Sequence, residues 1–106
     1  MQYCQLGRSG LKVSRLCLGT MMFGGATDEP ASGRIIDKAR AAGVNFIDTA
    51  DVYSNGASEE VVGRAIAAQR QHWVLATKLA NPTPLEETVR AIGDLIRSGT
   101  GAPPAA

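Results

Sequence analysis

The sequence predicts an α/β fold with parallel strands, because two apolar runs each end on a single charge and helix-spaced residues lie between them. Val44, Phe46 and Asp48 alternate along the first run and share one face of a strand, since side chains in a strand repeat every two residues. The second run extends from Trp73 to Lys78. A helical crossover makes such strands parallel and brings their carboxyl ends to one edge of the sheet, where α/β ligand sites form.

The charges at these strand ends predict a site. An unpartnered buried carboxylate costs on the order of several kcal/mol, so Asp48 requires a cation or donors, and Lys78 is its natural partner. Tyr53 follows in the loop that leaves the same strand end. We therefore expect Asp48 and Lys78 within salt-bridge or near-salt-bridge reach, with Tyr53 at the same end of the sheet. The pattern alone equally allows a buried ion pair beside an unrelated loop aromatic.

A hairpin and a first core strand are predicted upstream. Residues 2–6 and 11–13 flank Gly7-Arg8-Ser9-Gly10, and a glycine-bearing loop of this length is typical of a β-hairpin. Residues 16–20 are predicted as the first strand of the sheet. Gly19 lies near its C-terminal end, where a backbone without a side chain can approach a ligand closely.

Two crossover helices are predicted between the strands. The first follows Thr27 or Asp28, either of which can cap it, has Pro30 in its first turn and ends at Gly43. The second starts at Ser58, whose hydroxyl is expected to cap it. Helical spacing predicts the buried stripes, which are Ile35, Ile36, Ala39 and Ala42 in the first helix and Val62, Ala65 and Ile66 in the second.

Composition and charge narrow the classes of partner. The chain has 106 residues, of which 44% are hydrophobic, and a net charge of +1 without a basic run, so a small molecule is expected rather than a nucleic acid or a membrane. Met1 is followed by no basic leader and no long apolar run, which predicts a cytoplasmic protein. Cys4 and Cys17 are expected to be reduced and partly buried. They lack metal-ligand spacing and His72 is the one histidine, so no metal site is expected.

Several motifs resemble the aldo-keto reductases. They are Phe46-Ile47-Asp48-Thr49-Ala50-Asp51-Val52-Tyr53, Ser58-Glu59-Glu60-Val61-Val62-Gly63 and Ala76-Thr77-Lys78. Residues 6–14 and 16–24 resemble that family's opening hairpin and first barrel strand, so the likeness covers residues 1 to about 82.

The resemblance implies NADPH-dependent reduction of an aldehyde or ketone to an alcohol. In that family a tyrosine protonates the carbonyl oxygen while an aspartate and a lysine tune it, and here these residues are Tyr53, Asp48 and Lys78. A neighbouring ammonium favours a phenolate, which gives the pairing a physical rationale. The resemblance also implies that Thr20 and Met21, together with Asp48, border the nicotinamide ribose of NADP(H). It favours an inherited active-site geometry over the structural ion pair.

The family's catalytic histidine, on the fourth strand, has no counterpart in this sequence. His72 precedes the strand that ends at Lys78, so it is expected at the opposite end of the sheet, as a surface or edge residue. From Asn81 the family pattern changes. Residues 85–98 are predicted to form one amphipathic helix that resembles a much later helix of the family. The family's strands and helices between Lys78 and that later helix therefore look skipped in this sequence.

The resemblance and the length together imply a partial TIM (β/α)8 barrel, because a whole one takes about 250 residues. The expected parts are the hairpin and three parallel strands with flanking helices. An incomplete aldo-keto reductase domain is expected over residues 1–99, with a disordered tail over residues 100–106.

Two functions remain in competition. One is the reductase, and the other is a catalytically inactive remnant or interaction fragment that self-associates through its exposed barrel face. Three strands leave two unpaired edges, which drive association. Loss of positioned cofactor binding removes the orientation that the chemistry needs, so we favour the inactive alternative for the chain alone.

Overall fold

A computed structural model describes residues 1–80, and it begins with the predicted hairpin. Strands β1 (Tyr3–Gln5) and β2 (Lys12–Ser14) pair antiparallel around the glycine-bearing loop, as expected. The helix predicted over residues 85–98, the end of the domain at residue 99 and the tail over residues 100–106 lie outside the described residues.

Three short parallel strands form the main sheet. They are β3 (Cys17–Gly19), β4 (Phe46–Asp48) and β5 (Val74–Ala76), in the spatial order β3-β4-β5. The register aligns Cys17 with Phe46 and Val74, and Gly19 with Asp48 and Ala76. All three strands are shorter than predicted, yet single hydrogen bonds continue the β4–β5 ladder in both directions, from Val74 N to Asn45 O and from Asp51 N to Lys78 O.

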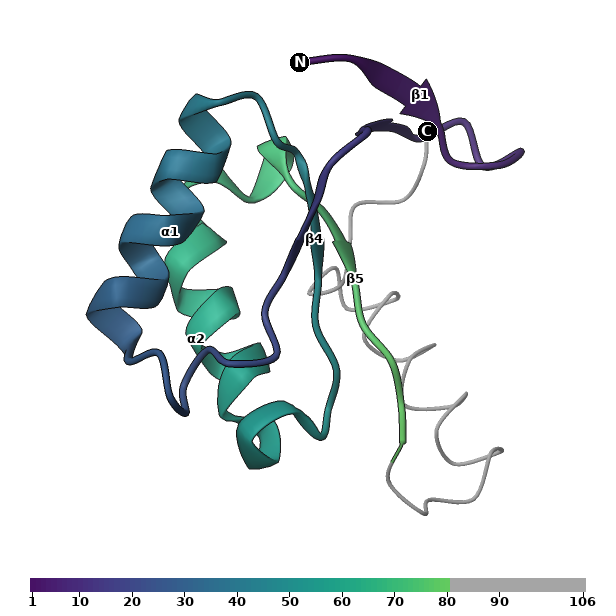
Figure 1. Ribbon diagram of the computed structural model, residues 1–106. Helices are drawn as coiled ribbons and strands as arrows, with labels where there is room; N and C mark the ends of the chain where they lie inside the picture. The colour runs from purple at the N-terminus through teal and green to yellow at the C-terminus, as the bar shows by residue number, and fades with distance from the viewer. Residues whose placement is uncertain (81–106) are drawn as a thin grey trace.

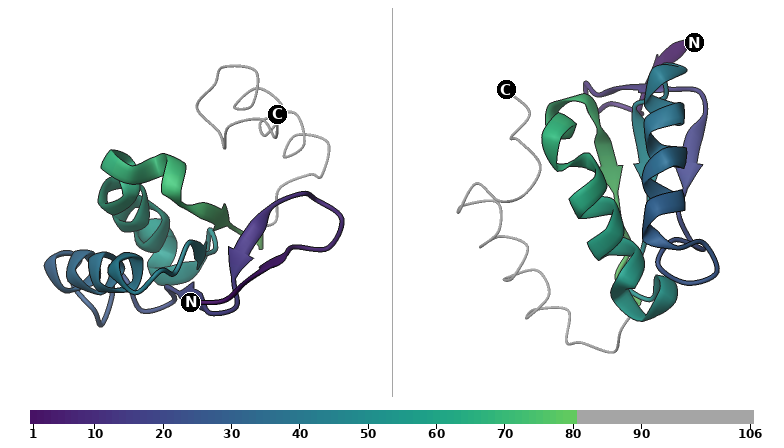
Figure 2. Two further views of the ribbon diagram at one scale, coloured as in Figure 1. Left: turned by 90° about the horizontal axis from the view of Figure 1, so that it is seen from above. Right: turned by 90° about the vertical axis from the view of Figure 1, so that its left-hand side faces the viewer.

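Two helices cover one face of this sheet. Helices α1 (Glu29–Ala41) and α2 (Ala57–Ile66) lie side by side on the same side of the strands (Figures 1 and 2). Short 3₁₀ helices precede and follow α2, namely η1 (Tyr53–Gly56) and η2 (Ala67–His72). Arg64 of α2 donates two hydrogen bonds of 2.8 Å to the carboxylate of Glu29, which joins the two helices.

The ends of α1 are those that the sequence predicts. The Asp28 carboxylate accepts a 2.9 Å hydrogen bond from Ala31 N, Pro30 lies in the first turn, and Gly43 follows the helix with a φ of +94°. Only a residue without a side chain adopts that conformation easily. The start of α2 differs from the prediction. Its N-cap is Gly56, with no side-chain cap, and Ser58 is instead fully buried.

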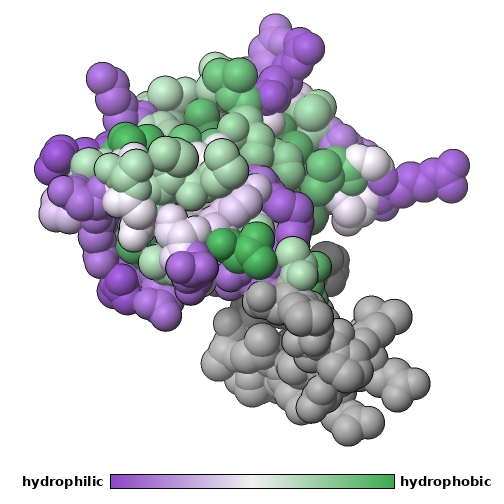
Figure 3. Space-filling view, turned by 60° about the horizontal axis from the view of Figure 1, so that its bottom comes forward, coloured by the Kyte–Doolittle hydropathy of each residue, from purple (hydrophilic) through white to green (hydrophobic). Residues whose placement is uncertain are grey.

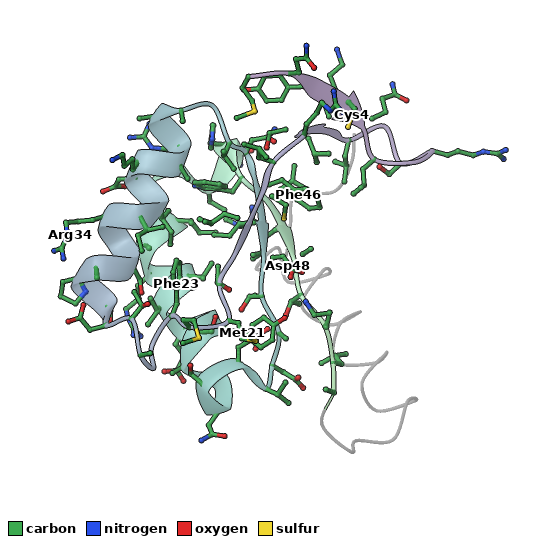
Figure 4. The ribbon with its side chains drawn as sticks, in the orientation of Figure 1. Cys4, Met21, Phe23, Arg34, Phe46 and Asp48 are labelled. Carbon is green, nitrogen blue, oxygen red and sulfur yellow. The ribbon has the colours of Figure 1, made fainter. Side chains whose placement is uncertain are left out.

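The core lies between the helices and the sheet. Its largest fully buried side chains include Ile36 of α1, Ile47 of β4 and Ile66 of α2. Figure 4 shows Phe23 in this layer and Arg34 pointing away from it. Of the predicted stripe of α1, Ile35 and Ala42 are exposed, because they lie to the sides of the face that Ile36 buries.

The opposite face of the sheet has no helix over it within the described residues. We call it the open face, and by register it carries Cys17, Phe46, Asp48, Val74 and Ala76. Because β3 presents Cys17 there and Cys4 lies on the hairpin, both cysteines are free and exposed, so the predicted partial burial is wrong.

The hairpin packs against the N-terminal end of the sheet (Figure 1). The Tyr3 hydroxyl donates a 2.6 Å hydrogen bond to Gly43 O. The Asn45 side chain accepts from Ser14 N at 2.7 Å and donates to Lys12 O at 2.9 Å. His72 lies at the same end, exposed as predicted, with its Nε2 2.9 Å from the carbonyl oxygen of residue 44.

Candidate active site

The predicted contact between Asp48 and Lys78 is present at the C-terminal end of the sheet. Lys78 Nζ donates to Asp48 Oδ2 at 2.8 Å, to Asp48 Oδ1 at 2.9 Å and to Thr49 O at 3.1 Å. An ammonium has three protons, so each of these contacts can take one. Two parallel strands thus hold one carboxylate and one ammonium in a fixed orientation.

The pair is partly open to solvent rather than buried as predicted. The side chains of Asp48 and Lys78 are 34% and 51% exposed, because both face the side of the sheet that no helix covers in the described part of the chain. The hydrogen bond to Asp48 raises the pKa of Lys78 above its ordinary value, Tyr53 contributes in the same direction, and partial desolvation opposes both. Lys78 is therefore a cation throughout the neutral pH range.

Tyr53 lies beside this ammonium. Lys78 Nζ is 5.0 Å from the centre of the Tyr53 ring, within the range of a cation–π contact. Tyr53 opens η1, and the next two residues, Ser54 and Asn55, have positive φ angles of 51° and 55°. Such angles are costly for residues with a Cβ and cluster at functional sites. This tight loop returns the chain toward the strand ends and keeps Tyr53 there.

A mostly apolar cavity of about 410 Å³ is lined in part by Asp48 and Tyr53, the two side chains that contact Lys78. Figure 3, seen from nearer the C-terminal ends of the strands, shows apolar surface mixed with hydrophilic side chains on this side of the molecule. Met21 is 60% exposed, and Figure 4 shows it near Asp48. The lining residues are Leu18, Gly19, Thr20, Met21, Met22, Phe23, Thr27, Ile35, Asp48 and Tyr53.

Thr20 lines the cavity, but its hydroxyl makes its hydrogen bonds inside the protein. Thr20 Oγ1 donates to Asp48 O at 2.8 Å and lies 3.0 Å from Ser58 Oγ. Ser58 Oγ donates to Thr20 O at 2.9 Å and is 2.9 Å from Thr49 Oγ1. These three residues, the hydroxyl cluster, are at most 2% exposed. The sequence patterns do not predict this cluster. Its only sequence signal is a small hydroxyl residue at each of two strand ends and one helix start.

Cys17 lies on the open face together with Asp48 and Lys78. Although Cys17 is exposed overall, the atoms packed around its thiol partly desolvate it and raise its pKa, the Asp48 carboxylate adds to this rise, and Lys78 lowers the pKa. Cys17 therefore responds to both members of the ion pair. Among residues 1–80 no group of three His, Cys, Asp or Glu side chains is placed to hold a metal ion. No helix in the same range is long and apolar enough to cross a membrane.

Comparison with known proteins identifies the family. The sequence profile of the Aldo/keto reductase family matches residues 15–93. The chain is 47% identical over 89 residues to the uncharacterized oxidoreductase YrpG of Bacillus subtilis (strain 168), a match that covers 77% of this chain and 27% of YrpG.

Two solved structures share the fold of this chain. The aldo-keto reductase AKR11C1 from Bacillus halodurans (holo form) superposes with a TM-score of 0.76 at 37% identity, over 92% of this chain and 36% of that one. An aldo-keto reductase from Klebsiella pneumoniae in complex with NADPH gives a TM-score of 0.64 at 26% identity, over 84% of this chain and 43% of that one. The predicted partial TIM barrel is thereby confirmed. The chain spans 27% of the length of YrpG and belongs to the aldo/keto reductase family of oxidoreductases.

Proposed function

We propose that Tyr53, Asp48 and Lys78 form the proton-donating part of a site that reduces an aldehyde or ketone to an alcohol with NADPH. The observation that carries the proposal is the position of Lys78 Nζ, which is bonded to both oxygens of the Asp48 carboxylate and lies 5.0 Å from the Tyr53 ring. This arrangement holds a positive charge beside a phenol that lines the mostly apolar cavity.

The chemistry depends on these positions. Tyr53 donates its hydroxyl proton to the carbonyl oxygen of the substrate, and the oxygen becomes the alcohol. NADPH, when bound, supplies the hydride that adds to the carbonyl carbon. The Lys78 ammonium stabilises the phenolate left on Tyr53, and Asp48 keeps the ammonium in place. The substrate class is a small carbonyl compound.

The cavity fits the nicotinamide end of the cofactor better than its phosphates. Thr20, Met21 and Asp48 all line it, as the proposed contacts to the nicotinamide ribose require. Its lining includes no basic side chain, whereas the phosphates of a dinucleotide are anionic and require cations or free amide groups. In this proposal the cavity takes the reacting end of the cofactor, and its lining offers no cation to the phosphates.

We expect no turnover by the 106-residue chain alone, because an unpositioned hydride donor loses the effective molarity on which much of the rate depends. The test follows NADPH consumption with 4-nitrobenzaldehyde, and a parallel fluorescence titration measures NADPH binding. The parent chain and Tyr53→Phe should both match the blank. Steady turnover that Tyr53→Phe abolishes would show that these residues hold the cofactor unaided.

The roles of the three residues are tested in a chimera. Residues 1–80 of this chain replace the matched segment of AKR11C1 from Bacillus halodurans. The chimera should reduce 4-nitrobenzaldehyde, and Tyr53→Phe should slow it by about 10²- to 10⁴-fold, the usual worth of a general acid. Tyr3→Phe, which changes a tyrosine of the hairpin, is the matched control and should leave the rate unchanged. An active chimera that is indifferent to Tyr53→Phe would refute the assignment.

A non-catalytic interaction role is the alternative. The observation that favours it is the open face, together with the unpaired outer edges of β3 and β5 within residues 1–80. The cytoplasmic location expected from the sequence belongs to the main proposal, and cell fractionation of a tagged chain tests it.

A further inference from the structure

The hydroxyl cluster lies directly behind the proposed active site, and the role inferred for it rests on the proposed reductase function. Ser58, Thr20 and Thr49 are 0%, 1% and 2% exposed. Burying a hydroxyl is costly unless it is hydrogen-bonded, and alanine or valine would fill the same places without that cost. Thr20 and Thr49 each contact Ser58, and this hydrogen-bonded set of three buried hydroxyls indicates a role beyond packing.

Ser58 is the central member. Its Oγ contacts Thr20 O, Thr20 Oγ1 and Thr49 Oγ1 at 2.9, 3.0 and 2.9 Å, and Thr20 Oγ1 also contacts Asp48 O at 2.8 Å. Three hydroxyl protons thus serve four contacts. One consistent arrangement has Thr20 donating to Asp48 O, Ser58 donating to Thr20 O and Thr49 donating to Ser58. The cluster connects the end of β3, the end of β4 and the first turn of α2.

The backbone that this cluster holds is the backbone of the ion pair. The backbone carbonyl oxygen of Asp48 accepts a hydrogen bond from Thr20 Oγ1. In the next residue, Thr49 N donates to Ala76 O and Thr49 O accepts from Lys78 Nζ. The cluster and β5 therefore fix this segment from two sides. Rotation of the segment would move both the Asp48 carboxylate and the Thr49 carbonyl away from Lys78.

We propose that Ser58 is a positioning residue, whose buried hydroxyl acts through Thr20 and Thr49 to fix the Asp48–Thr49 segment and so to hold Lys78 beside Tyr53. Ser58 itself is fully buried and does not line the cavity. Its effect reaches the site through two neighbouring hydroxyls and one stretch of backbone.

The titration of Lys78 measures this effect without requiring turnover. The chain has three lysines, Lys12, Lys38 and Lys78, so their side-chain carbons can be followed by NMR in a lysine-labelled full chain and assigned with single Lys→Arg variants. Ser58→Ala should lower the pH at which Lys78 titrates, because a looser Asp48 bonds the ammonium less well. Asp48→Asn, which removes the main cause of the raised Lys78 pKa, marks the full extent of that fall.

The matched control is Ser32→Ala. Ser32 is also 0% exposed and lies near the start of α1, where its hydroxyl donates a 2.7 Å hydrogen bond to Asp28 O. Ser32→Ala removes an equally buried serine hydroxyl whose hydrogen bonds go to Asp28 O and Thr27 O and to no member of the cluster. General destabilisation would affect both variants alike, whereas positioning predicts that only Ser58→Ala moves Lys78. A folded Ser58→Ala chain with an unchanged Lys78 titration would overturn the proposal.

A second pair of variants serves if Ser58→Ala does not fold. Thr49→Val keeps the shape of the side chain and removes its hydroxyl, so Lys78 should titrate at lower pH. Thr49→Ser keeps the hydroxyl and should restore the parent titration. Equal titrations in these two variants would also overturn the proposal. Because the measurement is made on the resting chain, it can fail while the chimera shows Tyr53-dependent turnover, or succeed while the chimera is inactive.

Discussion

Asp48 acts on two side chains at once. Its carboxylate holds the Lys78 ammonium at 2.8 Å and also influences the Cys17 thiol on the neighbouring strand. Parallel pairing places Cys17 beside Phe46, and Phe46 is the residue before Asp48 on the same open face, because alternate residues of a strand share a face. The ion pair therefore has a nearby reporter whose chemistry depends on charge, because the thiolate and not the thiol is the nucleophile.

Alkylation of Cys17 should follow the charge of its neighbours. In a Cys4→Ser background at pH 8, Asp48→Asn removes a cause that raises the Cys17 pKa, so more thiolate forms and the reaction accelerates. Lys78→Met removes a cause that lowers it, so the reaction slows. The rate with monobromobimane measures both. Because desolvation of the thiol is the larger cause, the changes should be modest, and changes of the same sign in both variants would contradict the assignment.

For single residues, the sequence predicts the contact between Asp48 and Lys78, because parallel strands bring their carboxyl ends together whatever the details of packing. The sequence does not predict the place of Ser58 in the hydroxyl cluster. A serine at the start of a helix favours capping, and only the tertiary structure shows that Thr20, distant in the sequence, competes for its hydroxyl. The partial exposure of the ion pair likewise depends on what covers the open face.

At the scale of elements, the loop between β3 and α1 is sterically constrained. Gly24 has a φ of +83°, and a Cβ there would lie 2.8 Å from the Cβ of Ala57, the first residue of α2. Gly24 N also donates to Thr27 O at 2.9 Å. The loop thus packs its backbone directly against the next helix, and it borders the proposed cofactor cavity.

Two glycine substitutions should have opposite effects on the free energy of unfolding. Gly24→Ala should destabilise the fold by about 1–3 kcal/mol, since it adds both strain and overlap. Gly33→Ala, in the interior of α1 with no atom within 4 Å of the added Cβ, should stabilise it by about 0.5–1 kcal/mol. Urea denaturation followed by circular dichroism measures both. Equal effects would show that the Gly24 loop relaxes at little cost.

Sequence reasoning predicts the helices better than the strands. Asp28, Pro30 and Gly43 define α1 through local stereochemistry, so its ends follow from the residues alone. The bounds of β3 and β5 depend on pairing with β4, and each strand is only three residues long. Exposure of Ile35 similarly depends on where α2 packs against α1, which spacing along one helix does not specify.

On the scale of the whole molecule, the open face and the outer edges of β3 and β5 favour association in the part of the chain that the structure describes. Unpaired strand edges offer amide and carbonyl groups to another chain, and the half-buried Phe46 and Val74 side chains on the open face add apolar area beside them. Cys17 and Cys4 offer a matched comparison, since both are exposed but only Cys17 lies on the open face.

The chain should therefore self-associate, with an apparent mass that rises above 11.1 kDa as its concentration increases. Cys17→Lys places a charge on the open face and should shift the population toward the monomer, whereas Cys4→Lys on the hairpin should not. Sedimentation velocity over a concentration series measures the effect. A monomer at every concentration, or an equal response to both substitutions, would exclude association through the open face.

Trp73, at the start of the strand that leads to Lys78, is the one tryptophan in the chain and is only 3% exposed. The His72 ring meets it edge-on, with the ring centres 4.9 Å apart. Its indole is thus a single built-in chromophore, which substitutions at Ser58, Cys17 and Gly24 leave in place. A blue-shifted emission maximum indicates that the indole is still shielded from water. One spectrum can thereby separate a variant whose active site has changed from one whose core has opened.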